Sequence, residues 1–205
     1  MILQIIMAVI TIIAVQVYYI VSEVWMTVRT TRGADNSADR GTRKLVWILC
    51  AVAFDVAWLP VIFSVGKLLT LGAWLTWIGV VIMISGVAFR LYVVNFLGKF
   101  FTATVQIRND HQLVRDGPYR HIRHPSYLGL LVLAFGNGIA LANWISLLLC
   151  IILPAIGILR RINVEEKELN SHFGERYQDY QKSTWRIIPY VYWNAGRKFF
   201  LRPNC

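Results

Sequence analysis

Long apolar segments alternate with shorter polar ones along the chain. Four apolar runs stand out, at residues 1–28, 45–65, 68–98 and 126–159. A helix rises about 1.5 Å per residue and the hydrocarbon core of a bilayer is about 30 Å thick, so about 20 residues are enough for one crossing. Each of the first three runs therefore predicts one transmembrane helix. The first lacks the positive start and small-residue cleavage site of a signal peptide, which favours a retained helix.

The fourth run would be about 51 Å long as a single helix, which is too long for one crossing. It is interrupted by the sequence GNG at Gly136 to Gly138 and by Asn143. We expect a helical hairpin over residues 125–160, with two short arms that turn near Ala142 and Asn143. The predicted fold is an all-α polytopic membrane helix bundle with five transmembrane helices, the last two forming this short hairpin. A hydrophobic fraction of 57% and a charged fraction of 16% agree with this class.

The positive charges predict how the bundle is oriented. Of the 21 Lys and Arg residues, five lie in 29–44, five in 98–124 and nine in 160–205. Positive residues favour the cytoplasmic side, so the N-terminus is expected outside and the C-terminus in the cytoplasm. Residues 1–98 then contain three transmembrane helices joined by a cytoplasmic loop at 29–44. The net charge of +10 follows from topology and attraction to anionic membrane lipids, and no nucleic-acid-binding motif accompanies it.

A basic cluster precedes the hairpin, in the stretch GPYRHIRHPSYLG at residues 117–129. Proline favours the first position of a helix and disfavours helix at the residue before it, so we expect the helix to begin at Pro125. The first N–H groups of a helix are unpaired and attract anions. Arg123, His124, Ser126 and Tyr127 would then line a polar pocket at the membrane surface, whereas Arg120 and His121 would contact lipid headgroups.

A second polar segment follows the hairpin. Arg161 and Glu165 are four residues apart and could pair on one helix face. Glu165, Glu166 and Glu168 form an acidic cluster, which either complements the local helix charge or binds a cation. From Ser171 onward the apolar positions predict a cytoplasmic C-terminal amphipathic helix, with Phe173, Tyr177 and Tyr180 on one face.

Three other features have more than one interpretation. Glu23, Asp55 and Arg90 are ionisable residues inside apolar runs, where pairing or snorkelling is favoured over a transport pathway. His121 and His124 have a metal-compatible spacing, but no nearby carboxylate or cysteine completes a ligand set, so no metal site is predicted. The three cysteines have no partner at the spacing of a metal site or disulfide.

Together the two polar segments resemble the isoprenylcysteine carboxyl methyltransferase family. The stretch HQLVRDGPYRHIRHPSYLG is similar to one sequence block of that family and VEEKELNSHFGERYQDY to another, and they cover about half of the chain, at residues 98–190. The resemblance implies an integral-membrane enzyme that uses S-adenosyl-L-methionine, held by cytoplasmic segments within 99–205. It implies a role for Arg161 in substrate binding and catalysis. It assigns the cofactor to Gln106, His111, Gln112, Leu113, Val114, Tyr119, His124, Pro125, Ser126, Tyr127 and Glu165.

The family implies methylation of the carboxylate of an isoprenylcysteine or similar lipid-like substrate at the cytoplasmic face. Such a carboxylate is already a nucleophile, so binding and orientation can supply much of the rate, and an arginine can clamp it. Methylation of a phospholipid amine is one alternative, and a small membrane transporter or interaction protein is another. The chain has no glycine-rich fingerprint of a Rossmann-type methyltransferase.

Overall fold

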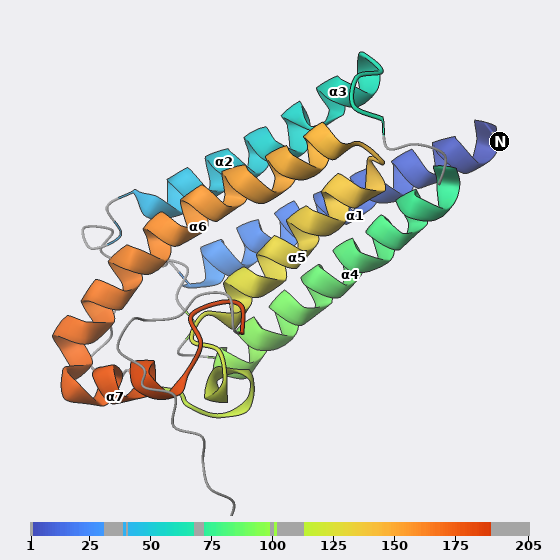
Figure 1. The fold of residues 1–205 in the computed structure, drawn as a ribbon. Helices are drawn as coiled ribbons and strands as arrows, with labels where there is room; N and C mark the ends of the chain where they lie inside the picture. Colours follow the sequence, from blue (N-terminus) through green and yellow to red (C-terminus); the bar gives the residue numbers. More distant parts are fainter. Residues whose placement is uncertain are drawn as a thin grey trace, which may run out of the picture.

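The computed structural model describes residues 2–30, 39, 41–67, 72–98, 101 and 113–189. These residues form a bundle of roughly parallel and antiparallel helices with a compact cap at one end (Figure 1). The elements in chain order are α1 (Ile2–Thr30), α2 (Thr42–Val56), α3 (Trp58–Ile62), α4 (Gly72–Leu97), the short 3-10 helix η2 (Gly117–Arg120), α5 (Pro125–Ala140), α6 (Trp144–Phe173) and α7 (Glu175–Ser183).

Four spans are long and apolar enough to cross a membrane: Ile6–Thr30, Thr42–Ile62, Trp74–Leu97 and Trp144–Phe173. The second span joins α2 and α3, which are separated only by Ala57. α5 is also apolar but has 16 residues, which correspond to about 24 Å of helix. The prediction of an all-α membrane bundle is confirmed, with four long helices and one shorter one.

Small residues bring α4 and α5 into close contact, side by side in Figure 1. A Cβ atom on Gly79 would lie 2.2 Å from the backbone nitrogen of Ala140, and one on Gly86 would lie 2.5 Å from that of Leu133. On the facing helix, a Cβ on Gly136 would lie 2.5 Å from the nitrogen of Met83. Glycines spaced seven residues apart share one helix face, which lets the two backbones approach as membrane helices commonly do.

The predicted hairpin turn is present between α5 and α6. Ala142 has a φ of 48°, and Oδ1 of Asn143 caps α6 by accepting from the nitrogens of Ile145 and Ser146. The hairpin differs from the prediction in two ways. α5 continues through the GNG stretch, because Gly136 packs against α4 and does not end the helix. The arms are also unequal, since α6 has 30 residues and extends well beyond residue 160.

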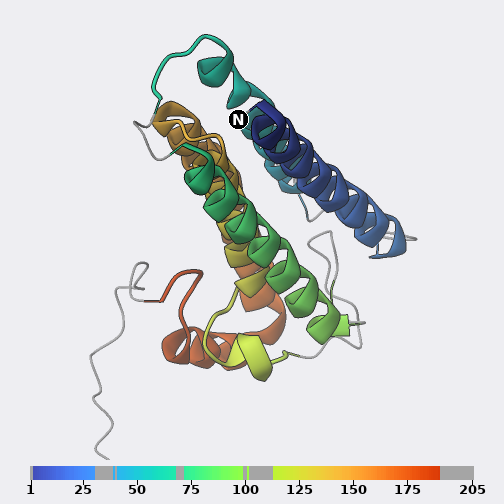
Figure 2. The same ribbon diagram turned by 90° about the vertical axis from the view of Figure 1, so that its right-hand side faces the viewer.

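The end of the bundle away from this turn carries a cap built from η2, α7 and residues 184–189 (Figure 2). The chain bends sharply at Gly174, whose φ is 52°, a conformation that favours glycine. An amphipathic C-terminal helix was predicted from Ser171 onward, but Phe173 belongs to α6 and the separate helix α7 begins at Glu175. Tyr177 and Tyr180 are buried on its inner face.

Candidate active site

A cavity of about 410 Å³ connects the cap with the interior of the bundle. Its wall near the cap contains polar side chains, among them Arg161, Glu165 and Glu168. α1 and α2 contribute apolar side chains to the wall, such as Ile20, Met26, Val46, Trp47 and Phe54, together with the charged Glu23, Arg43 and Asp55. The cavity therefore has a charged part around Arg161, Glu165 and Glu168, here called the charged chamber, and additional apolar wall surface from α1 and α2.

α5 begins at Pro125, as its sequence predicts, and His124 is the N-cap residue. The proline ring sets a helical φ and removes a backbone N–H that would have no helical partner. Both His124 and Ser126 line the cavity. The positive end of the α5 dipole therefore faces the charged chamber.

Residues 184–187, here called the C-terminal strap, run beside residues 121–124 and pair with them through the backbone. The nitrogen of Arg123 donates to the carbonyl of Trp185 (2.8 Å), and that of His124 donates to Arg186 (3.1 Å). In return, the nitrogen of Trp185 donates to the carbonyl of His121 (2.8 Å). The strap thus fixes the non-helical residues that lead into α5.

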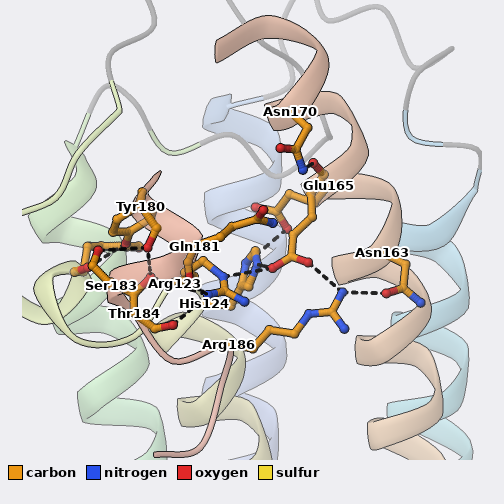
Figure 3. A network of polar contacts seen from close by, with 12 residues as sticks. Arg123, His124, Asn163, Glu165, Asn170, Tyr180, Gln181, Ser183, Thr184 and Arg186 are labelled. Atoms are coloured by element: carbon orange, nitrogen blue, oxygen red, sulfur yellow. Dashed lines mark hydrogen bonds and ion pairs between the residues drawn. The ribbon is translucent and has the colours of Figure 1, made fainter. Parts of the chain in front are cut away.

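The side chain of Glu166 lies among three positively charged or imidazole groups behind the chamber. Nε of Arg123 is 3.1 Å from Oε1, Nε2 of His124 is 3.3 Å from the same oxygen, and Nη2 of Arg186 is 2.8 Å from Oε2. Arg186 also contacts Asn163, and Arg123 reaches the backbone at Thr184 (Figure 3). Of the predicted acidic cluster, Glu166 is therefore structural, while Glu165 and Glu168 line the cavity.

A second polar network joins α5 and α6 inside the chamber. Nε of Arg161 donates to Oη of Tyr127 (2.6 Å), and this hydroxyl donates to Oε2 of Glu165 (3.0 Å). The predicted pair of Arg161 and Glu165 is thus linked through Tyr127. Nη1 of Arg161 also lies 2.7 Å from Oδ1 of Asp39, which balances the buried positive charge.

Glu23 and Arg90, noted as intramembrane charges, form a buried ion pair between α1 and α4. Nε and Nη2 of Arg90 lie 2.5 and 3.0 Å from the two carboxylate oxygens of Glu23, a bidentate geometry. Nη1 of Arg90 donates to the carbonyl of Ser126 (2.8 Å). Pairing is confirmed for these two residues, and the pair also holds the first turn of α5.

Most of the predicted cofactor and substrate residues gather around one cavity. Those that line it are Leu113, Val114, Tyr119, His124, Ser126, Tyr127, Arg161 and Glu165. Pro125 is buried at the start of α5. Gln106, His111 and Gln112 lie outside the described residues. The ligand-binding roles of all these residues stay predictions.

Two residues of the site were not predicted. Asp39 belongs to the loop 29–44, to which no chemistry was assigned, and it reaches Arg161 from far away in the sequence. Arg186 lies in an otherwise apolar stretch, WRIIP, near the end of the described chain. A single charge in such a stretch is a weak signal for a buried partner, and it does not identify which carboxylate it would meet.

Three tyrosines of the cap, Tyr119, Tyr177 and Tyr180, have pKa values raised above the ordinary tyrosine value. Burial is the main cause for each. The nearby carboxylate of Glu165 raises the pKa values of Tyr119 and Tyr177 further. These phenols therefore remain protonated at neutral pH, and the hydroxyl of Tyr180 donates its hydrogen bond to the carbonyl of Tyr119.

The fold and the cavity define the class of the protein: a helical integral-membrane protein with a charged site at one end of its bundle. The model of the isoprenylcysteine carboxyl methyltransferase (ICMT) family matches residues 77–171. This region contains most of α4 and α6 and the whole of α5, which carry the charged chamber. Over residues 77–171 the chain is therefore similar to the ICMT family, as the two sequence blocks suggested.

Similar proteins extend the match beyond this region. A protein-S-isoprenylcysteine O-methyltransferase of Dictyostelium discoideum is 34% identical over 147 residues, which are 71% of this chain and 60% of the relative. Protein-S-isoprenylcysteine O-methyltransferase A of Arabidopsis thaliana is 32% identical over 120 residues, 58% of this chain and 61% of the relative. The chain thus spans about three fifths of the length of these curated relatives.

A solved structure supports the same fold. The eukaryotic intramembrane Ras methyltransferase ICMT is similar with a TM-score of 0.56 and 28% sequence identity. The match covers 77% of this chain and 55% of that protein. The helical arrangement is therefore shared over most of the chain.

Proposed function

We propose that this protein is an integral-membrane methyltransferase that uses S-adenosyl-L-methionine to methylate the carboxylate of an isoprenylcysteine or a similar lipid-like substrate. The observation that carries the proposal is the cavity, in which a charged chamber containing Arg161 and Glu165 adjoins apolar wall surface contributed by α1 and α2. A substrate with a carboxylate at the end of a lipid chain matches both parts. The family match and the names of the relatives point to the same reaction.

The residues of the charged chamber fit the cofactor. Glu165 and Glu168 supply carboxylates for an ammonium group, and among the described residues no hydrogen bond occupies Oε1 of Glu165. The start of α5 favours a carboxylate. Leu113 and Val114 supply apolar surface on the wall of the same cavity, as an adenine ring requires. The volume of about 410 Å³ lies within the range of small-molecule sites.

The bound cofactor would supply an electrophilic methyl group, so an ionised acceptor needs no general base. Arg161 would bind the acceptor carboxylate, because its guanidinium is buried, charged and already 2.7 Å from one carboxylate, that of Asp39. Tyr127 holds Nε of Arg161 and one oxygen of Glu165 through a single hydroxyl. It therefore fixes the spacing between the acceptor site and the cofactor site, and good orientation contributes much of the rate.

The proposed orientation places the cap and the charged chamber in the cytoplasm and the N-terminus outside. It rests on the excess of Lys and Arg in 29–44, 98–124 and 160–205. Replacing Lys67 by Cys in a Cys205→Ser background would test it. Cys50 and Cys150 are buried, so an impermeant thiol reagent added outside intact cells should label only Cys at position 67. Labelling only after permeabilisation would reverse the orientation.

The function is tested by transfer of tritiated methyl groups from the cofactor to farnesylcysteine analogues, fatty acids and phosphatidylethanolamine in parallel. We expect a base-labile ester on the farnesylcysteine analogue. Arg161→Gln should abolish transfer, because the acceptor loses its clamp. Arg160→Gln is the matched control, since Arg160 is the exposed neighbour of Arg161 and should be dispensable. Transfer only to the phospholipid amine would contradict carboxyl methylation.

A further inference from the structure

Tyr177 on α7 has a buried hydroxyl group that makes no hydrogen bond within the described part of the chain. Its side chain is 1% exposed, and no described residue contributes a hydrogen-bond partner to Oη. Tyr180, three residues further along the same helix, differs in this respect, because its hydroxyl donates to the carbonyl of Tyr119 at 2.6 Å. The two tyrosines thus share a helix face, but among the described residues only the hydroxyl of Tyr180 has a hydrogen-bond partner.

An unsatisfied buried hydroxyl destabilises a protein relative to a phenylalanine of the same shape, so it calls for a reason. Tyr177 lines the cavity, beside the chamber that contains Glu165 and Glu168. Burial and the neighbouring Glu166 and Glu165 raise its pKa above the ordinary value. The hydroxyl is consequently a protonated donor, and it belongs to a residue of the wall of the cavity, where a bound ligand would be the source of the missing acceptor.

The neighbouring charges indicate which part of a ligand that acceptor belongs to. Glu165 and Glu168 on the cavity wall favour an ammonium group. In an amino-acid moiety, a carboxylate lies next to the ammonium group and accepts strong hydrogen bonds. The carboxylates of Glu165 and Glu168 are better partners for the ammonium group than a hydroxyl is. The hydroxyl of Tyr177, as a hydrogen-bond donor, instead matches the adjoining carboxylate of the ligand.

We propose that the hydroxyl of Tyr177 donates a hydrogen bond to the carboxylate of the amino-acid moiety of bound S-adenosyl-L-methionine, which makes Tyr177 a cofactor-binding residue. The proposal rests on the function proposed above. It assigns α7 a direct role in binding, in addition to its packing against α6. It also explains why this position has a tyrosine, although a phenylalanine would make the ligand-free protein more stable.

The test is calorimetric binding of S-adenosyl-L-methionine and of its decarboxylated form to the full chain in detergent. The Tyr177→Phe variant should bind S-adenosyl-L-methionine about 5- to 10-fold more weakly, as expected for one hydrogen bond. Its affinity for the decarboxylated form should equal that of the unchanged protein. Without ligand, its melting temperature should be unchanged or higher, because an unsatisfied hydroxyl has been removed.

Tyr180→Phe is the matched control. It loses a hydrogen bond that the protein makes by itself, so its ligand-free melting temperature should fall while the ratio of the two affinities stays constant. Equal affinity of Tyr177→Phe and the unchanged protein for S-adenosyl-L-methionine would overturn the inference, as would an equal loss for both ligands. Failure of the unchanged protein to bind S-adenosyl-L-methionine would instead contradict the proposed function.

Discussion

Arg186 in the C-terminal strap and Glu166 in α6 form a buried ion pair, with Nη2 of the arginine 2.8 Å from Oε2 of the glutamate. Arg123 and His124 hold the other oxygen of the same carboxylate. Glu166 therefore ties three segments together: the residues before α5, the end of α6 and the strap. These segments surround the charged chamber, so its shape depends on a residue that does not itself line the cavity.

Arg186→Gln should loosen this arrangement. Removing one partner of a buried ion pair costs about 3–5 kcal/mol of folding free energy, so the melting temperature in detergent should fall. The affinity for S-adenosylhomocysteine should fall as well, because His124 and the strap lose a fixed position. Lys182→Gln is the control, since Lys182 pairs with Asp179 on the exposed surface and should change neither quantity. Normal stability of Arg186→Gln would contradict the structural role.

Asp39→Asn should affect the acceptor more than the cofactor. Asp39 lies 2.7 Å from Nη1 of Arg161, where, under the proposed function, it would compete with the carboxylate of a substrate. Without its charge, we expect the KM for a farnesylcysteine analogue to fall severalfold and the melting temperature to drop, because Arg161 is less well neutralised. Initial rates at varied acceptor concentration would measure this, with the exposed Asp179→Asn as control. An unchanged or higher KM would argue against competition.

The pair of Glu23 and Arg90 should contribute to stability only when both charges are present. Glu23→Leu and Arg90→Met each leave an uncompensated buried charge, and each should cost about 3–5 kcal/mol. The double variant should be less destabilised than the sum of the two, which a double-mutant cycle of melting experiments would reveal. Additive losses would mean that the two residues act independently, in contradiction to their bidentate contact.

Gly136→Ala should disturb the packing of α4 against α5. The added methyl group would lie 2.5 Å from the nitrogen of Met83, so the helices must separate. Overpacking of this kind costs about 1–3 kcal/mol, and it should lower the melting temperature and the yield of folded protein. Ser85→Ala, on an exposed face of α4, is the control. A stable Gly136→Ala variant would show that the two backbones can move apart freely.

High pH should destabilise the cap. The pKa values of Tyr119, Tyr177 and Tyr180 are raised in the folded state, so folding disfavours their ionisation. Their contribution to stability is complete below the unfolded value of about 10 and declines above it. The melting temperature should therefore be steady to about pH 9.5 and fall at higher pH. A titration of phenolate absorbance should show these tyrosines ionising later in folded than in denatured protein.

Local rules predicted much of the fold. Pro125 indicated the start of α5, and Asn143 indicated the turn into α6, because proline and asparagine act on the backbone next to them. The GNG stretch was misinterpreted as an interruption, since Gly136 is required by a neighbouring helix that the local sequence does not show. The contacts of Asp39 and Arg186 were missed for the same reason: each joins residues that are distant in the sequence.

The pairing of the strap with residues 121–124 also has a consequence for biosynthesis. The described membrane helices, α1 to α6, all precede residues 184–187 in the chain, so they are synthesised first. Until then, Arg123 and His124 lack the backbone partners that hold them beside Glu166. The charged chamber therefore gains these backbone supports only after its helices have been synthesised, and a chain cut after Ser183 would keep the membrane helices while losing the site.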